Sequence, residues 1–543
     1  MSGLFAVILP VLLAALLRGP ARLRGWVFRL APFVPLALLP VLLIPGELML
    51  GLQLVGLSLV PDEVAQPLLW LTLVAWGLSG WLAASKIDQH RTAFWSGWLL
   101  ALAGMNLLLL AGNVVTFYLG YAMVGLSAYL LVVHARTAEA WRAGRIYLVL
   151  ALMGEAAILA GVLLLAGRLG NVEFVVLAEG TQALESGLAG WLFLFGFAIK
   201  LGILPLHVWL PLAHPVAPVP ASAILSGVIV KAGLLGWLRL VPAAPLATDG
   251  LGLALLLLGL ATALGGVLLG LTQQRVKTVL AYSTISQMGL VLCGFSLWFL
   301  LPDQREIILA MLGLLALHHG LNKAALFLAC ANQPGASRLR LMLFALPAVS
   351  LAAAPLTTGF IAKDQLKATL YLAEPGGLVM LLVSLSSTAT AILMWRAFSM
   401  ARQMNDRSVA IHPAWPLLVL AALILPWWQA LTMGVANLPG AGKLWSASWP
   451  LVLAAGLIVL WGRGLKGRGV TLPEGDLVVG LERMVAALVH LGRSMTTLSP
   501  SVPEWRWNTQ RAQVLLEWLA RVERRLPLVG LVMVLITVLF LFR

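Results

Sequence analysis

Long apolar stretches, separated by short polar segments, dominate this chain of 543 residues. A helix needs about 17–25 mostly apolar residues to cross a lipid bilayer. By that measure the chain has about sixteen candidate spans. They cover residues 2–17, 30–46, 67–85, 93–112, 114–134, 145–167, 187–210, 219–240, 249–271, 277–301, 306–332, 341–373, 376–400, 413–436, 448–463 and 526–542. The pattern predicts an all-α polytopic membrane protein with about 14–16 transmembrane helices.

Three segments depart from this pattern. Residues 1–17 lack a basic start and lead into Arg18, which indicates a first span rather than a cleaved signal. Residues 49–60 are too short to span, and we expect a loop packed on the surface. Residues 464–525 form a long polar and amphipathic segment. A helix lying in the membrane interface on the cytoplasmic side explains them more simply than a docking site for a partner subunit.

Composition excludes a water-soluble enzyme. The chain is 61% hydrophobic and only 10% charged, with a mean hydropathy of +0.97. A soluble domain carries about 25% charged residues. The net charge of +15 reflects an excess of Arg and Lys in alternate loops, so it fits membrane topology better than nucleic-acid binding. The first loop carries Arg18, Arg22, Arg24 and Arg29, and later odd loops are also basic.

That alternation predicts cytoplasmic odd loops and an outside N-terminus, as expected for a bacterial-type inner membrane protein.

The two cysteines, Cys293 and Cys330, lie in apolar runs without ligand spacing, so we expect no disulfide framework, metal site or cluster. Nucleotide-binding and nucleophile motifs are absent from the sequence, and we expect no cofactor.

Lysines inside apolar segments are the most informative charges. The chain has nine Lys against 27 Arg, yet Lys200, Lys231, Lys323 and Lys363 all fall inside apolar stretches. A charge at mid-bilayer costs at least about 2.5–3.5 kcal/mol. Arginine keeps its proton, whereas a buried lysine can release it. One such lysine, Lys363 for example, could reach the interface along its alkyl chain, but four together indicate proton handling.

Acidic and imidazole groups accompany these lysines. Glu155 lies between apolar neighbours in the middle of a predicted helix. His318 and His319 precede Lys323, and His319 shares its helix face. A single intramembrane His often only bonds a neighbouring helix, but two beside a Lys favour a proton path. Asp364 adjoins Lys363 and is expected to pair with it or to cap a helix break there.

Prolines predict two interrupted helices. Pro205 and Pro211 follow Lys200, and Pro355 with Gly359 precedes Lys363. Non-helical backbone at membrane depth is tolerated only where it is buried in protein or lines a cavity. Matched broken helices in two halves indicate a transporter built from inverted repeats.

Several long motifs resemble one membrane family. They are KLGILPLHVWLPLAHPVAPVPASAILSGVIVKAGLLGWLR, KTVLAYSTISQMG, HHGLNKAALF and TTGFIAKDQ. They are similar to the antiporter-like, proton-conducting subunits of respiratory complex I, of membrane-bound hydrogenases and formate hydrogenlyase, and of multisubunit cation/proton antiporters. The resemblance covers residues 113–400 most strongly.

The resemblance implies two inverted five-helix repeats, with helices 7 and 12 broken, each forming a half-channel. By position, Lys200 resembles the lysine of broken helix 7 and Lys231 the lysine that leads to the centre. His319 and Lys323 resemble the central relay, and Lys363 the exit-side residue of helix 12. The remaining implied positions are His207 and His214, which match histidines at the first break and have a structural or a relay role.

One departure affects the first half-channel. The family usually pairs the helix-7 lysine with a glutamate in a Trp-Glu pair, where this chain has Tyr121 and Ala122. Leu212 likewise replaces an acid of the family motif. Glu155 is the candidate substitute, or else this half-channel is altered.

We therefore expect six regions. They are N-terminal helices 1–112, half-channels 113–240 and 249–400, C-terminal helices 413–463, the polar segment 464–525 and a last helix 526–543. The chain has no redox or active-site motif, so we expect a proton-translocating subunit of a complex I-like or hydrogenase-like translocase, with other membrane subunits as partners.

Two other functions use the same channel. One powers bicarbonate uptake with a soluble partner, and the other exchanges Na⁺ for protons. A membrane glycosyl- or acyl-transferase is disfavoured, because such enzymes need acids or a His at the membrane boundary, whereas these charges lie in mid-span.

Overall fold

The computed structural model describes residues 2–43, 52–54, 56–169, 173–174, 187–241, 250–332, 337–404, 410–435, 439–461, 472–475, 477 and 479–480. The chain divides into two compact units, Met1–Leu472 and Pro473–Arg543. Nearly all described residues belong to the first unit. The expected amphipathic segment 464–525 and the last helix 526–543 lie almost entirely outside the described residues.

The described part of the first unit is helical apart from one small hairpin. Its N-terminal elements are α1 (Ser2–Leu16), α2 (Ala21–Leu30), η1 (Ala31–Leu38), α3 (Leu39–Leu43), β1 (Leu52–Leu54), β2 (Leu57–Leu59), α4 (Gln66–Lys86) and α5 (Arg91–Leu109). The first expected half-channel contains α6 (Val114–Val132), η2 (Val133–Ala135), α7 (Ala138–Leu169), α9 (Gly187–Leu201), α10 (Trp209–Val216), α11 (Val219–Ile224), η3 (Leu225–Ile229) and α12 (Lys231–Leu240).

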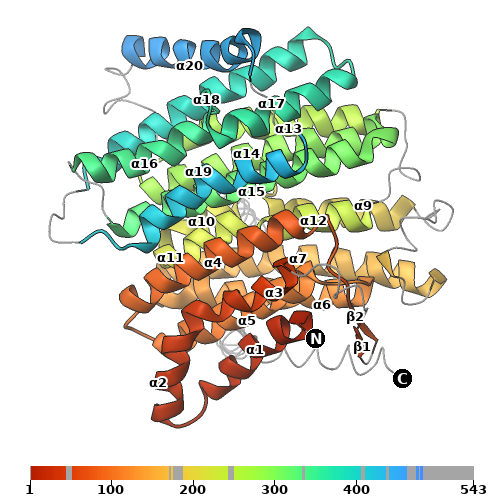
Figure 1. Cartoon of the computed structure of the whole chain (residues 1–543), viewed down its shortest axis with the longest axis vertical. Helices are drawn as coiled ribbons and strands as arrows, with labels where there is room; N and C mark the ends of the chain where they lie inside the picture. The colour runs from red at the N-terminus through yellow and green to blue at the C-terminus, as the bar shows by residue number, and fades with distance from the viewer. Residues whose placement is uncertain are drawn as a thin grey trace, which may run out of the picture. The chain divides into compact units, whose positions relative to one another are not determined.

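The second expected half-channel contains α13 (Leu251–Leu271), α14 (Val276–Leu300), η4 (Pro302–Gln304), α15 (Arg305–Asn332), α16 (Arg338–Leu351), α17 (Thr358–Leu372) and α18 (Gly377–Ala401). It is followed by α19 (Ala414–Thr432) and α20 (Ala441–Trp461). The helices lie side by side, and α19 returns to lie beside α15 and α4 (Figure 1).

Twelve of the described helical segments are long and apolar enough to cross a membrane, and Ser2–Leu16 and Gly187–Leu201 are shorter apolar helices. The predicted class, an all-α polytopic membrane protein, is confirmed. Both predicted interruptions are present as well. One lies between α9 and α10, and the other between α16 and α17.

Two local predictions are wrong. Arg22, Arg24 and Arg29 do not lie in a loop, because α2 begins at Ala21 and continues through η1 and α3 as one apolar segment to Leu43. Residues 52–54 and 57–59 do not form a loop but the two strands, β1 and β2, of an antiparallel hairpin. The Ser58 amide donates to Thr116 Oγ1 (3.0 Å) at the start of α6, which holds this hairpin against the helices.

Enclosure is uneven among the spans. In an apolar 18-residue stretch of Val219–Leu240 and of Val276–Leu300, 94% and 89% of the residues are buried, against 11% in such a stretch of Ala441–Leu460. Small residues allow the closest approaches: a side chain at Gly120 of α6 would collide with the backbone of α5. The enclosed helices are those that carry Lys231 or pack against Lys323, so the buried charges occupy the centre of the fold.

Candidate functional site

The first break places Lys200 at the end of a helix. Helix α9 ends at Leu201, and Gly202 adopts φ 71°, a conformation that L side chains rarely adopt. Pro205 follows, with a cis peptide bond after Leu204. The Trp209 indole N–H of α10 donates to the Ile199 carbonyl (2.8 Å), which also accepts from the Gly202 amide (3.1 Å). His207 and Trp209 after the break are buried, whereas Pro205 within it is exposed.

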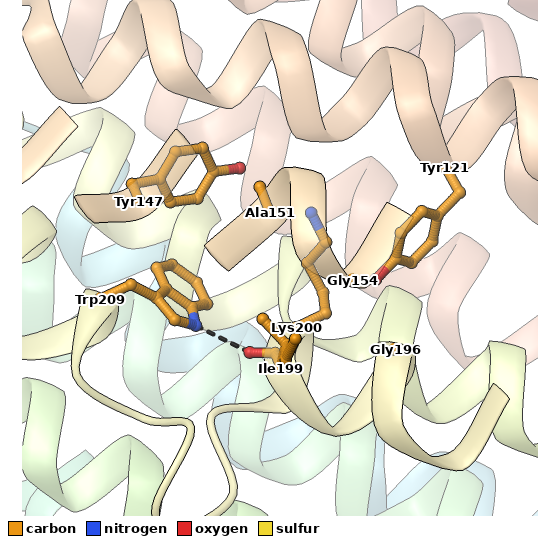
Figure 2. Close-up of a pocket in the computed structure, with 8 residues that line it drawn as sticks. All are labelled: Tyr121, Tyr147, Ala151, Gly154, Gly196, Ile199, Lys200 and Trp209. Atoms are coloured by element: carbon orange, nitrogen blue, oxygen red, sulfur yellow. Dashed lines mark hydrogen bonds between the residues drawn. The ribbon is translucent and has the colours of Figure 1, made fainter. Parts of the chain in front are cut away.

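The Lys200 ammonium group lies among aromatic rings. Figure 2 shows it between Tyr121 and Tyr147, where it lines a small cavity. Its nitrogen is 4.9 Å from the ring centre of Tyr121 and 5.9 Å from that of Tyr147. Aromatic faces attract cations, more strongly where water is excluded. Among the described residues the ammonium group has no hydrogen-bond partner.

Glu155 of α7 is the one buried acid among the described residues, and it faces the same glycine as this lysine. The Glu155 carboxylate and the Lys200 ammonium attract each other, and both are buried. The two groups face Gly125 of α6: an added Cβ there would overlap Glu155 Oε1 and lie 3.2 Å from Lys200 Nζ. The Tyr147 hydroxyl donates to the Gly125 carbonyl (2.9 Å). Glu155 thus approaches Lys200 from α7. The family's usual glutamate position, Ala122 in this chain, is on α6.

Lys231 lies at the centre, directly after a π-helical turn. Its ammonium group donates to the Ser226 carbonyl (2.7 Å), and it lies 2.7 Å from His319 Nδ1. A π-turn shifts the backbone register by one residue and often marks a functional position. Here η3 ends at Ile229, and only Val230 separates it from Lys231. The sequence pattern predicted an uninterrupted span over 219–240 and missed this turn.

Lys323 completes the central group. Its ammonium donates to the Leu280 carbonyl of α14 (2.6 Å), and Lys323 itself is fully buried. The charges of Lys231 and Lys323 act on each other and on His319. The predicted neighbours on one face of α15 are therefore brought together with Lys231 from the first half.

The second break lies between α16 and α17. Pro355 occupies the connection, and Ala353 and Leu356 adopt φ of 63° and 64°. Thr357 caps α17 by accepting from the Phe360 amide. Behind it, Thr358 Oγ1 lies 3.0 Å from His318 Nδ1 and 2.9 Å from Ser350 Oγ. His318 is thus tied to the break rather than to the Lys231–His319 contact.

Lys363 and Asp364 point to different partners. The Lys363 ammonium donates to Ser387 Oγ of α18 (3.1 Å), and Lys363 is buried. Asp364 does not pair with Lys363 and does not cap the break, because it forms an ion pair with Lys443 of α20 (2.7 Å). Successive residues of a helix are separated by about 100° around its axis, which explains why neighbours in sequence serve different faces.

The two histidines of the first break are buried. The ring of His207 lies 6.0 Å from that of Tyr282, and His214 stacks on Phe327 at 4.6 Å between ring centres. The charges of Lys277 and Lys323 also act on His214. Lys277 itself donates to the carbonyls of Pro215 and Ala217 at the end of α10. His214 therefore packs on α15, one helical turn after Lys323.

The hydroxyl and aromatic partners of the charged groups could not be predicted from the sequence. Tyr147, Thr358 and Ser387 contact the charged groups, yet isolated Tyr, Thr and Ser in apolar helices carry no distinguishing spacing. Lys443 lies between the predicted spans 413–436 and 448–463, and no pattern linked it to Asp364. Within the described ranges, no group of three or more His, Cys, Asp or Glu residues could hold a metal ion.

Comparison with known proteins finds relatives among hydrogenase and formate hydrogenlyase subunits. Hydrogenase-4 component B of Escherichia coli is 36% identical over 239 residues, or 42% of this chain and 35% of the relative. Formate hydrogenlyase subunit 3 of the same organism is 31% identical, over 50% of this chain and 45% of the relative. The chain thus spans less than half the length of these two curated relatives.

A solved structure shares the fold. The Mrp complex from Dietzia sp. DQ12-45-1b contains a chain that matches 96% of this one at 20% identity, with a TM-score of 0.72, and 62% of that chain is covered. The family model described as "NADH:quinone oxidoreductase/Mrp antiporter, TM" matches residues 111–390, more than half of the sequence. These residues contain both helix breaks and all four buried lysines. The chain is therefore a multi-pass membrane protein that belongs to the NADH:quinone oxidoreductase/Mrp antiporter transmembrane family.

Proposed function

We propose that this chain is a proton-translocating subunit of a larger energy-converting membrane complex. The contact that carries the proposal is the 2.7 Å approach of Lys231 Nζ to His319 Nδ1 in the buried centre. A lysine ammonium and a neutral imidazole nitrogen at this distance form a donor–acceptor pair across which a proton can move. Two unpaired structural cations would not approach each other so closely in a low-dielectric interior.

The other buried groups extend this pair in both directions. Toward the first break we assign Glu155 and Lys200 as a pair whose charges change together. Toward the second break we assign Lys323 and Lys363, with His318 and Asp364 as accessory groups near the exit. His207 and His214 at the first break are assigned a relay role, while Pro205 and Pro355 keep the two breaks open.

Stepwise transfer is energetically plausible over such spacings. Two charges about 8 Å apart interact by about 2 kcal/mol at an effective dielectric constant of about 20. That interaction is large enough for a proton gained at one lysine to favour proton loss at the next. The energy must come from partner subunits, and the related proteins named as hydrogenase and formate hydrogenlyase components support such an assembly. We place the complex in an inner membrane, with the N-terminus outside.

The test is proton movement by the intact complex in sealed membrane vesicles, followed with a pH-sensitive dye. We expect Lys200→Ala and Lys323→Ala to abolish it, while Lys86→Ala, at the exposed end of α4, leaves it unchanged. Copurification of the partner subunits checks assembly. Normal proton movement by both buried-lysine variants would contradict the proposal.

A further inference from the structure

A cavity separate from the buried lysines lies where α4 begins and α19 ends. Its volume is about 320 Å³, within the range of small-molecule sites. Glu63, Gln66 and Trp70 line it from one side, and Trp428, Gln429 and Thr432 from the other. Figure 1 shows α19 lying beside α4. None of the groups assigned to proton transfer lines this cavity.

One buried polar atom in the cavity wall has no partner. The side chain of Gln429 is 6% exposed, and its carbonyl oxygen accepts no hydrogen bond among the described residues. Its amide nitrogen reaches only the sulfur of Met433, at 3.8 Å. An unsatisfied buried acceptor is costly and rare. A ligand that donates a hydrogen bond to this oxygen would remove the cost.

The rest of the wall selects a positive charge. Asp62 forms an ion pair with Arg239 (2.7 Å), whereas the adjacent Glu63 has no ion pair among the described residues. None of the residues that line the cavity is basic. Trp70 and Trp428 meet edge to face with ring centres 5.3 Å apart. A carboxylate beside indole rings attracts an ammonium group and repels an anion.

An apolar stripe leads from the cavity along α19. Leu417, Leu420, Ile424 and Leu431 are all exposed, at helical spacing, on the face that includes Trp428. An alkyl chain lying along this stripe would keep its head group at Trp428, where indole rings commonly lie at the membrane interface. We propose that the cavity binds the ammonium head group of a membrane amphiphile, with Gln429 and Glu63 as its acceptors.

Binding is tested by titration calorimetry of the full chain in phosphatidylglycerol nanodiscs, with empty nanodiscs subtracted. We expect dodecylammonium to bind and dodecanoate not to bind. Gln429→Met should weaken dodecylammonium binding about tenfold, because the acceptor is lost. Glu63→Gln should weaken it about threefold, as for an exposed charge pair. Dodecyltrimethylammonium, which has no N–H donor, should bind equally to the parent chain and Gln429→Met.

Controls separate the site from partition into lipid. Glu306→Gln, at the start of α15, and Trp395→Leu, an exposed indole of α18, should leave binding unchanged. Gln429→Met should unfold at or above the parent temperature, because it removes an unsatisfied polar atom without losing a strong hydrogen bond. Equal binding of dodecanoate, or binding unchanged by both site variants, would overturn the proposal.

Addition of phosphatidylethanolamine identifies the source of the head group. Competition with dodecylammonium would assign the site to a lipid ammonium group, and absence of competition would assign it to a free amine. Both outcomes support an ammonium site. None of these readouts involves proton transport, so failure here is distinguishable from failure of the proposed function.

Discussion

The two helix breaks place similar lysines in different surroundings. Lys200 beside the first break faces a buried carboxylate, Glu155, and two tyrosine rings. Lys363 beside the second break donates to a neutral hydroxyl, Ser387, while the nearby acid Asp364 binds Lys443 of the poorly buried helix α20. The first lysine therefore lies near a buried acid without bonding to it, and the second is held by a hydrogen bond near the outer helices.

This difference between the two breaks bears on the direction of proton movement. A buried acid near a lysine couples the charge of one group to that of the other. A lysine bonded to a serine has no acid of this kind beside it. If protons pass through both sites, we expect the first break to act as the controlled site and the second as the outlet.

The largest expected effect is at Glu155. Glu155→Gln should reduce proton movement by the complex about 100-fold, the scale of removing one acid–base group. Glu155→Gln combined with Lys200→Ala should lose little more, since the two groups act as one unit. Glu306→Gln is the matched control on an exposed helix start. Full activity in Glu155→Gln would show that the two breaks do not differ in this way.

The free energy of unfolding should also differ between variants at the first and at the second break. Glu155→Gln leaves the Lys200 ammonium without its acid, which costs about 3 kcal/mol in buried pairs. Replacing both groups, as Glu155→Leu with Lys200→Met, should recover most of that loss. Ser387→Ala at the second break removes only a hydrogen bond to Lys363 and should cost about 1.5–3 kcal/mol. Unfolding temperatures in detergent measure these differences, and a double variant no more stable than Glu155→Gln would contradict the pairing.

Two glycines separate side-chain from backbone effects. A Cβ at Gly125 would meet the carboxylate of Glu155, a movable side-chain end. A Cβ at Gly359 would meet the backbone carbonyl of Ser350, which cannot move aside. We expect Gly359→Ala to cost about 1–3 kcal/mol of stability. Gly125→Ala should keep stability but impair proton movement. A Gly125→Ala variant that loses more stability than Gly359→Ala would refute this assignment.

The smallest effect should be at the surface ion pair. Lys443 is half exposed, so Lys443→Ala should change the free energy of unfolding by less than about 1 kcal/mol. Its effect on proton movement should also be smaller than that of Lys363→Ala, measured in the same vesicles. A loss as large as that of Lys363→Ala would make Lys443 part of the path.

Much of this arrangement follows from the sequence. Apolar length predicts the membrane class, and proline with glycine predicts both breaks, because these residues disrupt helical backbone in a way that single sequences reveal. Spacing also placed His319 and Lys323 on one face of α15. These features are local, so nearby residues determine them.

Partners across helices could not be predicted in the same way. Asp364 and Lys443 are 79 positions apart, and the contact of Lys231 with His319 spans 88. Such contacts depend on how helices pack. The π-turn before Lys231 was missed because its residues are as apolar as those of an ordinary helix. The expected pairing of Asp364 with Lys363 failed since adjacent helical residues face different neighbours.

The proposed mechanism requires that a buried lysine transfer protons rather than supply a fixed charge. Lys323→Arg tests it most directly, because arginine retains the positive charge but does not release its proton. The measurement is protons moved per turnover of the assembled complex in sealed vesicles. We expect Lys323→Arg to lose proton movement as fully as Lys323→Ala. Normal proton movement in Lys323→Arg would contradict it.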